Sequence, residues 1–537
     1  MDTENHSTRS LPLLDRSRSL EKLQQIPSWD IAIVGGGATG LGIAVDAASR
    51  GYRTLLLERH DFAKGTSSRS TKLVHGGVRY LAMGDIKLVY SALRERGIIF
   101  KNAAHLAHAQ SFVIPCYSVF SKLKYLVGLK IYDWMAGKYR IGKSSLLSRP
   151  ETEKRLPGIK TTGLKGGVQY FDGQFDDARL AINLAQTAAQ HGATLLNYCN
   201  VTALTKSDTG KLEGLTCVDA ESGQIHTIKA ACIINATGVF VDDVLHMDTE
   251  DHEPLVRPSQ GAHVVLDRTF LGQEDALMIP KTSDGRVLFG VPWHDHLVLG
   301  TTDTLIAESD AEPLPLEQEI QFILETAASY LVRAPRLSDV KSMFAGLRPL
   351  AAPQNGEETT KEISRDHKLL VSQSGLVTIT GGKWTTYRKM AEETIDKAIG
   401  VAGLPRKACV TMSTPIHGLG PSDTDGHWAI YGTDAPKIMK LAEKNVSLRE
   451  HLHSKFAHIG AEVAWACRHE MARTVEDVLA RRLRILFLDA AASIQMAPKV
   501  ATILAAELGR DAAWAAQQVE DYTRLAKSYL PIGSGHP

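Results

Sequence analysis

The sequence predicts an α/β fold in three parts: a doubly wound parallel-sheet domain, an antiparallel-sheet domain inserted into it, and an all-α C-terminal domain. Three observations lead to this prediction. A β-branched strand near residue 30 runs directly into a glycine-rich turn and a helix. Between residues 256 and 303 the texture changes to short strands and tight turns. From about residue 413 the chain is rich in Ala and Leu at helical spacing.

The composition is that of an ordinary globular protein longer than one typical domain. The chain has 537 residues, of which 44% are hydrophobic and 23% charged. Lys and Arg number 61 against 60 Asp and Glu, so there is no global electrostatic argument for nucleic acid. No apolar run approaches the roughly 18–20 residues of a membrane-spanning helix. Peripheral attachment to a membrane is compatible with this composition. The six cysteines and the histidines form no cluster at metal-ligand spacing, so no metal site is expected.

A polar N-terminal extension precedes a βαβ unit. Residues 1–28 are mixed in charge, lack the apolar core of a secretory signal, and predict a loosely ordered extension. The apolar run 30–34 predicts a buried parallel strand, followed by a glycine-rich turn and a helix that ends at Gly51. A second strand over 54–58 completes the unit.

The glycine-rich turn has the spacing and the context of a dinucleotide site. Gly35 permits the tight turn, Gly37 lets the backbone approach a pyrophosphate, and Gly40 allows the helix to pack closely on the strand. The helix N-terminus offers free N–H groups to the phosphates. Glu58, at the end of the second strand, is placed to accept both ribose hydroxyls of an adenosine.

The segment that follows favours FAD over NAD. Residues 65–81 read GTSSRSTKLVHGGVRYL, and their hydroxyl and backbone donors suit a long, extended cofactor. The motif Ala236-Thr237-Gly238 follows a strand and returns the chain to the same sheet. Val201 is placed to touch an adenine edge.

Later segments predict further helices, strands and solvated faces. Asp176 or Asp177 caps a helix that Gly192 closes, and another helix is expected over 384–400. Strands are predicted over 194–206, 211–219 and 225–235. Two sets of polar side chains are expected to face solvent. His294 and His296 are expected at a hairpin tip, and Arg481, Arg482 and Arg484 on the outer face of a helix. The predicted domains are the extension 1–28, the cofactor domain 29–115, 175–250 and 345–412, the substrate domain 116–174 and 251–344, and the helical domain 413–537.

Several motifs appear together in one order: the glycine-rich turn, GTSSRSTKLVHGGVRYL, INATG, PSQGAHVVL, GTTDT, AGLRPL and GGKWTTYRKMAEETID. In these motifs the chain resembles the FAD-dependent respiratory glycerol-3-phosphate dehydrogenases, which belong to the glycine-oxidase and D-amino-acid-oxidase superfamily. The resemblance covers about residues 29–400, and the tail 413–537 resembles the C-terminal domain of the same enzymes.

The resemblance implies FAD as cofactor, sn-glycerol 3-phosphate as substrate, dihydroxyacetone phosphate as product and a quinone as electron acceptor. It also implies a cytoplasmic protein attached peripherally to the inner face of the cell membrane, and it allows a homodimer. The residues that it assigns to FAD are Gly35, Gly37, Gly40, Glu58, Thr66, Ser67, Ser68, Lys72, His75, Gly76, Val201, Ala236, Gly238 and Gly382. Those that it assigns to the substrate are Arg79, Tyr80, His263, Arg348 and Lys383.

The chemistry of alcohol oxidation suggests roles for several of these residues. Arg79, Arg348 and Lys383 are cations from distant segments, which suits a phosphate. Removal of the hydroxyl proton at neutral pH needs a base, and histidine is the usual choice. His75 lies in the segment that wraps the cofactor, so His263 is the expected base and Lys383 the next candidate.

Two other functions remain open from the sequence. One is an oxidase of the same fold that passes electrons to oxygen and acts on glycerol 3-phosphate or an amine. The other is a non-catalytic flavin-binding protein. Residues 117–143 interleave aromatic and aliphatic side chains with six Lys and Arg and predict either a segment at an anionic lipid surface or a half-buried basic helix.

Overall fold

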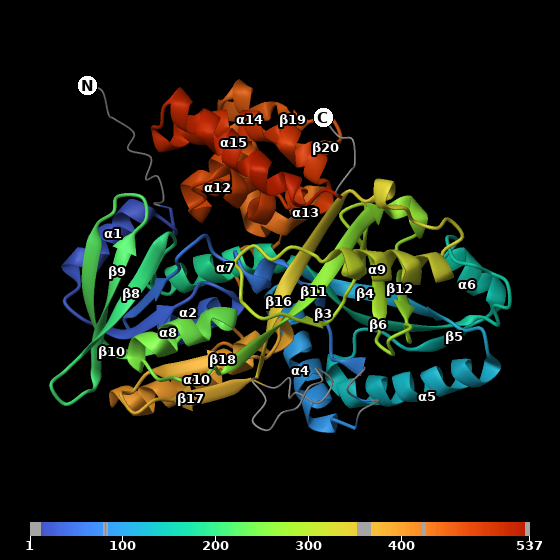
Figure 1. Cartoon of the computed structure of the whole chain (residues 1–537), viewed down its shortest axis with the longest axis horizontal. Coiled ribbons are helices and arrows are strands. Elements are labelled where there is room, and N and C mark those ends of the chain that lie inside the picture. Colours follow the sequence, from blue (N-terminus) through green and yellow to red (C-terminus); the bar gives the residue numbers. More distant parts are fainter. Residues whose placement is uncertain (1–11, 79–80, 82–83, 352–366, 422–425, 532–537) are drawn as a thin grey trace.

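Two large sheets and a helical C-terminal region make up the described part of the chain (Figure 1). The computed structural model describes residues 12–78, 81, 84–351, 367–421 and 426–531. The first sheet has five parallel strands in the order β18-β10-β1-β2-β7, with β17 antiparallel at one edge. β9 and β8 extend β10 as an antiparallel ribbon. The strands are β1 Trp29–Val34, β2 Thr54–Leu57, β7 Thr194–Leu196, β8 Cys199–Lys206, β9 Leu212–Asp219, β10 Ile225–Asn235, β17 Lys368–Val371 and β18 Val377–Thr380.

Alternating residues of β1 pack into two separate cores, which explains its continuous apolar run. Ile31 and Ile33 contact the core under α2, α7 and α10. Ala32 and Val34 contact the opposite core, which β8, β9, α1 and α8 cover. The helices are α1 Arg16–Gln25, α2 Ala38–Ser49, α7 Asp177–Gln190, α8 Val241–Asp248 and α10 Tyr387–Ala402. The predicted parallel sheet, covered on both faces, is confirmed.

The described part of the N-terminal extension is ordered. The side chain of Asp15 accepts a hydrogen bond from the backbone N–H of Arg18 and caps α1. The buried guanidinium of Arg16 lies 2.6 Å from Asp219 Oδ1 and donates to the carbonyl of Asn197. The expectation of a loosely ordered segment is therefore wrong for residues 12–28. The order of this segment depends on the contacts of Arg16 with Asn197 and Asp219, which lie far along the chain. The local composition does not reveal these contacts.

Among the described residues, the second sheet is antiparallel except for one parallel pair, β12 with β4. Its order is β15-β11-β14-β13-β12-β4-β6-β3, with β16 paired to β11 and β5 to β6. The strands are β3 Leu73–Val74, β4 Ala107–Pro115, β5 Ser145–Leu147, β6 Gly167–Phe175, β11 Val256–Asp267, β12 Ala276–Ile279, β13 Leu288–Trp293, β14 His296–Gly300, β15 Thr304–Leu305 and β16 Ser342–Ala351. Its helices are α4 Ile86–Asn102, α5 Val119–Ala136, α6 Arg149–Arg155 and α9 Glu317–Tyr330.

Sheet membership differs from the predicted domain boundaries at three places. β3, β4 and the end of β16 pair within the second sheet, although the boundaries assign them to the cofactor domain. Pairing between strands that are distant in sequence determines which sheet a strand joins. The residues near each strand do not indicate this pairing. The other predicted domain boundaries stay predictions. The tip between β13 and β14 is exposed at His294 and Asp295, as expected for a hairpin turn.

The C-terminal region lies above both sheets in Figure 1. Apart from a short hairpin, β19 His451–His453 with β20 Phe456–Ile459, it is helical. Its helices are α11 Ala435–Lys444, α12 Gly460–Glu470, α13 Ile485–Leu488, α14 Ala490–Leu508 and α15 Ala512–Lys527, with a 3₁₀ segment Gly426–Asp434 and a π-helical turn Asp477–Arg482. The predicted all-α character is thus confirmed in its main elements.

The arginines of the π-helical turn are buried, not solvated. Asp61 lies 2.5 Å from Arg481 and 2.7 Å from Arg482, and all three side chains are at most 2% exposed. Arg484 pairs with Asp177 at 2.8 Å. The prediction of a solvated helix face is wrong because acids from the first sheet's segments neutralise these charges across the interface. Desolvated charges need such partners.

Candidate functional site

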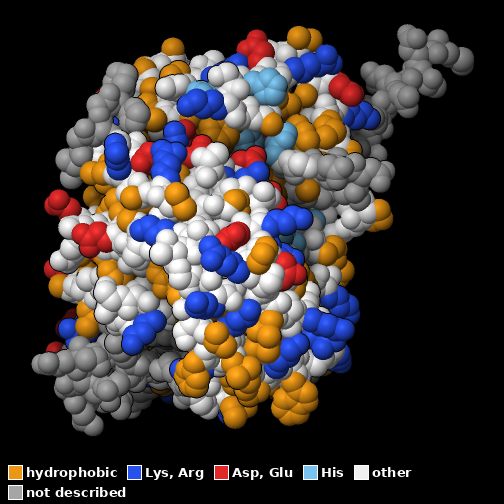
Figure 2. Space-filling model, turned by 90° about the vertical axis from the view of Figure 1, so that its right-hand side faces the viewer, with side chains coloured by type: hydrophobic (Ala, Val, Ile, Leu, Met, Phe, Trp, Pro, Cys, Tyr) orange, Lys and Arg blue, Asp and Glu red, His pale blue; other side chains and the backbone are white. Residues whose placement is uncertain are grey.

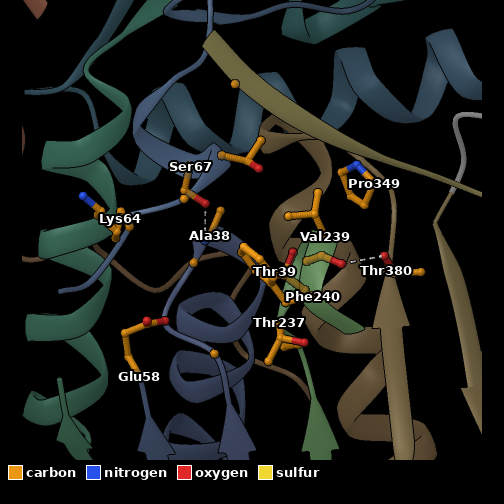
Figure 3. Close-up of a pocket in the computed structure, with 18 of the residues that line it drawn as sticks. Ala38, Thr39, Glu58, Lys64, Ser67, Thr237, Val239, Phe240, Pro349 and Thr380 are labelled. Atoms are coloured by element: carbon orange, nitrogen blue, oxygen red, sulfur yellow. Dashed lines mark hydrogen bonds between the residues drawn. The ribbon is translucent and has the colours of Figure 1, made fainter. Parts of the chain in front are cut away.

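A cavity of about 650 Å³ lies between the two sheets, at the carboxyl ends of β1, β2 and β10. This is the place where open parallel sheets bind ligands. Figure 3 shows Glu58, Thr39, Ser67, Thr237 and Phe240 around the space. The glycine-rich turn therefore opens onto a cavity large enough for a cofactor.

Two glycines of the turn have no room for a side chain. Gly35 has φ +109°, and a Cβ there would stand 2.6 Å from the carbonyl oxygen of Ala236. A Cβ on Gly40 would stand 1.9 Å from the carbonyl oxygen of Gly35. Gly37 precedes α2, whose first residue Ala38 donates its N–H to Ser67 Oγ at 2.9 Å (Figure 3). The turn is thus a close-packed backbone cradle at a helix N-terminus, which suits a pyrophosphate.

Glu58 is held at the edge of the cavity by backbone donors. Its Oε2 accepts from the N–H of Gly36 at 2.6 Å and its Oε1 from the N–H of His60 at 2.8 Å. Desolvation raises the pKa of Glu58 above its usual range, although the two N–H donors oppose this shift. The carboxylate therefore has a fixed orientation beside the space where the sequence predicts an adenosine ribose.

Most of the predicted FAD residues line this cavity. Those that do are Gly35, Gly37, Glu58, Thr66, Ser67, His75, Val201, Ala236, Gly238 and Gly382. Four do not, namely Gly40, Ser68, Lys72 and Gly76. Gly40 supports the turn from behind, and a Cβ on Gly76 would instead meet Tyr132.

The side chain of Lys72 points away from the cavity. It is fully buried, with Nζ 2.7 Å from Asp177 Oδ2 and 2.8 Å from the carbonyl oxygen of Ser68. Burial lowers the pKa of Lys72 to about 7, against the opposing charge of Asp177. A buried ammonium needs a carboxylate, so this lysine pairs within the protein behind the cavity wall.

Both sheets bring expected substrate residues to the same cavity. His263 lies on β11, Arg348 on β16, and Lys383 follows β18, and all three line the space. Arg79 and Tyr80 lie outside the described residues. The cations and the histidine, distant in sequence, thus share one cavity with the nucleotide turn.

His263 is held by one ring contact and one hydrogen bond. Its ring stacks on Phe344 with centroids 4.7 Å apart, and its Nε2 lies 2.9 Å from Thr71 Oγ1. The side chain is 2% exposed. Burial, followed by the charges of Lys72 and Arg348, lowers the pKa of His263 well below 6.5. The ring is therefore neutral at pH 7 and able to accept a proton.

The guanidinium of Arg348 is oriented by the segment that follows β14. It donates to the carbonyl of Thr302 at 3.1 Å and to Thr301 Oγ1 at 3.2 Å, and it lies 3.4 Å from Asp303 Oδ1. A Cβ on Gly261 would stand 2.4 Å from this guanidinium, so the glycine gives it room. The sequence interpretation missed these supports, although GTTDT holds three of them.

A second cavity of about 190 Å³ borders the first and shares Arg348, His75 and Thr71 with it. Aromatic residues Phe112, Tyr170 and Phe289 line it. Arg286 adds a further cation to its wall. No signal in the sequence singled out Arg286, which lies in the loop between β12 and β13.

Comparison with family models and known proteins gives one consistent result. Residues 30–388 match the family described as FAD dependent oxidoreductase, and residues 373–515 match the C-terminal domain of alpha-glycerophosphate oxidase. A mitochondrial glycerol-3-phosphate dehydrogenase of Arabidopsis thaliana is 40% identical, over 89% of this chain and 82% of its own. The human mitochondrial glycerol-3-phosphate dehydrogenase is 37% identical, over 97% of this chain and 76% of its own.

A solved structure is similar over nearly the whole length. It is the glycerol-3-phosphate dehydrogenase from Bacillus halodurans in complex with FAD, with a TM-score of 0.79 and 27% identity. The similarity covers 97% of this chain and 99% of that one. The arrangement of two sheets and a helical C-terminal region is therefore shared with a flavoprotein.

Proposed function

Because the chain belongs to the family of FAD-dependent oxidoreductases, we propose that it oxidises sn-glycerol 3-phosphate to dihydroxyacetone phosphate through FAD and passes the electrons to a quinone. The resemblance seen in the sequence motifs is confirmed. The observation that supports the proposal most strongly is one cavity that is lined both by the glycine-rich turn and by His263, Arg348 and Lys383. Relatives named glycerol-3-phosphate dehydrogenases match almost the whole chain.

The cavity fits FAD by its donors and by its shape. The turn at Gly35 and Gly37 offers backbone N–H groups at the start of α2, where a pyrophosphate is favoured. Glu58 presents an oriented carboxylate for a ribose. When bound, FAD supplies the hydride acceptor for oxidation of the substrate carbon. We propose that the cavity-lining residues of the predicted set hold it, with Gly40 supporting the turn.

His263, Arg348 and Lys383 suit a phosphorylated alcohol. Arg348 offers a fork of donors and Lys383 a compact charge, and together they match a phosphate dianion. His263, neutral at pH 7, takes the proton of the C2 hydroxyl. The negative charge of the substrate raises the pKa of His263 once it is bound, which strengthens it as a base. An amine oxidase would not need this concentration of cations.

The electron acceptor separates this proposal from an oxidase of the same fold. Purified protein loaded with FAD and reduced anaerobically by glycerol 3-phosphate should be reoxidised rapidly by a soluble quinone. Oxygen should reoxidise it at least about tenfold more slowly. Rapid reoxidation by oxygen with hydrogen peroxide as product, and no response to quinone, would favour the oxidase instead.

We propose peripheral membrane attachment through one face of α5. No helix in the described part of the chain has the length and apolar character needed to span a bilayer. Six large apolar side chains of α5 point outward, each 45–81% exposed: Val119, Phe120, Leu123, Val127, Ile131 and Trp134. Figure 2 shows hydrophobic side chains gathered at the bottom of this side of the molecule, with Lys and Arg around them. Leu129 and Tyr132 face the core instead.

An outward apolar stripe flanked by lysines suits an anionic lipid surface. It supports the lipid alternative over a half-buried basic helix, since the apolar side chains are the exposed ones. The lysines beside the stripe are Lys122, Lys124 and Lys130. Attachment to the inner face of the cell membrane and a homodimer remain predictions.

Replacing Phe120 and Trp134 together by serine should weaken binding to anionic liposomes by at least about tenfold, because two aromatic anchors are lost. Changing Lys122, Lys124 and Lys130 to glutamate should abolish the preference for anionic lipid. Flotation with and without anionic lipid measures both effects. Val446→Ser removes an equally exposed side chain from the C-terminal region and should have no effect. If both α5 variants bind anionic liposomes as the parent does, α5 is not the membrane-binding element.

A further inference from the structure

Three side chains of metal-ligand type meet in the helical C-terminal region, apart from both cavities. His427 belongs to the 3₁₀ segment Gly426–Asp434, His458 to β20, and Glu462 to the first turn of α12. One possible ligand atom of each lies within 4.8 Å of the others. None of the three lines the cavities described above. We propose that His427, His458 and Glu462 bind a zinc ion.

The geometry leaves one ring nitrogen in need of a partner. His458 Nδ1 lies 2.8 Å from Glu462 Oε1, a normal hydrogen bond. His427 Nε2 lies 3.7 Å from Glu462 Oε2, which is too long for one. This nitrogen is buried and has no hydrogen-bond partner among the described residues. A buried polar atom without a partner carries a desolvation cost, which a metal ion beside the carboxylate would remove.

The donor set selects the metal. Two imidazoles and one carboxylate form a common zinc set that leaves a fourth position for water. Hard cations such as Ca²⁺ and Mg²⁺ prefer oxygen ligands alone. Small rearrangements of the side chains bring the three donors from within 4.8 Å of each other to the spacing that tetrahedral zinc requires.

The surroundings support and admit an ion. The hydroxyl of Tyr431 donates to Glu462 Oε1 at 2.9 Å, and the N–H of Ile459 donates to Oε2 at 2.8 Å. Such outer contacts fix the orientation of a ligating carboxylate. The side chain of Glu462 is fully buried, whereas that of His427 is 21% exposed, so an ion enters from the His427 side. Zinc would join the 3₁₀ segment to β20 and α12.

Zinc content measures this proposal independently of enzyme activity. The full-length, FAD-loaded protein is dialysed against buffer with micromolar Zn²⁺, and its metal content is determined by mass spectrometry. The parent should retain one zinc per chain, and His427→Ala should bind it at least about 100-fold more weakly. His451→Ala, which removes an exposed histidine from the same region, should retain the ion.

A melting curve gives a second readout. Zn²⁺ should raise the melting temperature of the parent and of His451→Ala, but not that of His427→Ala or of a second variant, His458→Gln. An unchanged far-UV circular dichroism spectrum shows that each variant is folded. A parent that retains no zinc at micromolar concentration would overturn the proposal, and so would equal retention by His427→Ala.

Discussion

Replacing His263 by alanine should slow reduction of the bound flavin by glycerol 3-phosphate by about 10²–10⁴-fold at pH 7. The neutral ring is the group in the cavity best suited to take the hydroxyl proton, because Arg348 stays charged at this pH. FAD content and binding of dihydroxyacetone phosphate should persist, since Arg348 and Lys383 remain. Stopped-flow absorbance of the flavin measures the rate.

His296→Ala provides the matched control for this variant. His296 lies on β14, beside β11, and its ring faces Phe456 and the turn, away from the cavity lining. Its rate should equal that of the parent. A rate for His263→Ala within about threefold of the parent would contradict the assignment and make Lys383 the next candidate for the base.

Replacing Asp61 by alanine should destabilise the protein by about 3–5 kcal/mol. This change removes the buried carboxylate that Arg481 and Arg482 share. Arg481 keeps Glu476 and Asp477 as partners, and Arg482 keeps Glu470 at 3.5 Å. The loss should appear as a lower urea midpoint and as early exposure of the C-terminal helices. Urea unfolding of the FAD-loaded protein, followed by circular dichroism, measures it.

Asp521→Ala is the comparison for Asp61→Ala. Asp521 lies 3.4 Å from Arg524, but the two side chains are 48% and 69% exposed. An exposed ion pair contributes at most about 1 kcal/mol, so this variant should unfold close to the parent. Equal stability of Asp61→Ala and the parent would show that the arginines find other partners or solvent.

Local patterns predicted the elements around the nucleotide turn well. The run Asp30–Val34 and the spacing of Gly35, Gly37 and Gly40 carry their information within a few residues, because strand, turn and helix N-terminus follow each other directly. The structure places the strand at Trp29–Val34 and begins the helix at Ala38. The same local logic located β9 and β10. The single strand expected over 194–206 is wrong, because the chain forms two strands there, β7 paired with β2 and β8 paired with β9.

Long-range contacts explain what the sequence did not reveal. The order of α1 depends on Arg16 reaching Asp219, and the burial of Arg482 depends on Asp61. Pairing of β4 with β6 places residues 107–115 in the second sheet. His427, His458 and Glu462 come together only through folding of the C-terminal region. None of these contacts has a mark in the nearby sequence.

The motifs for the substrate end were strong, but their geometry was not predictable. His263 and Arg348 lie on neighbouring strands because β16 pairs with β11 over the whole length of β16. Lys72 looked like a cofactor ligand by position, yet Asp177 draws its ammonium into the protein. A motif identifies the residue, whereas the packing of the folded chain determines the direction of its side chain.

Anaerobic titration of the FAD-loaded protein with glycerol 3-phosphate tests the central claim most directly. The oxidised flavin spectrum should bleach with about one equivalent of glycerol 3-phosphate per flavin, and dihydroxyacetone phosphate should appear in equal amount. Glycerol, which lacks the phosphate that Arg348 and Lys383 would bind, and glycine should not bleach it at the same concentration. Bleaching by glycine, or an unchanged spectrum with excess glycerol 3-phosphate, would contradict the proposed function.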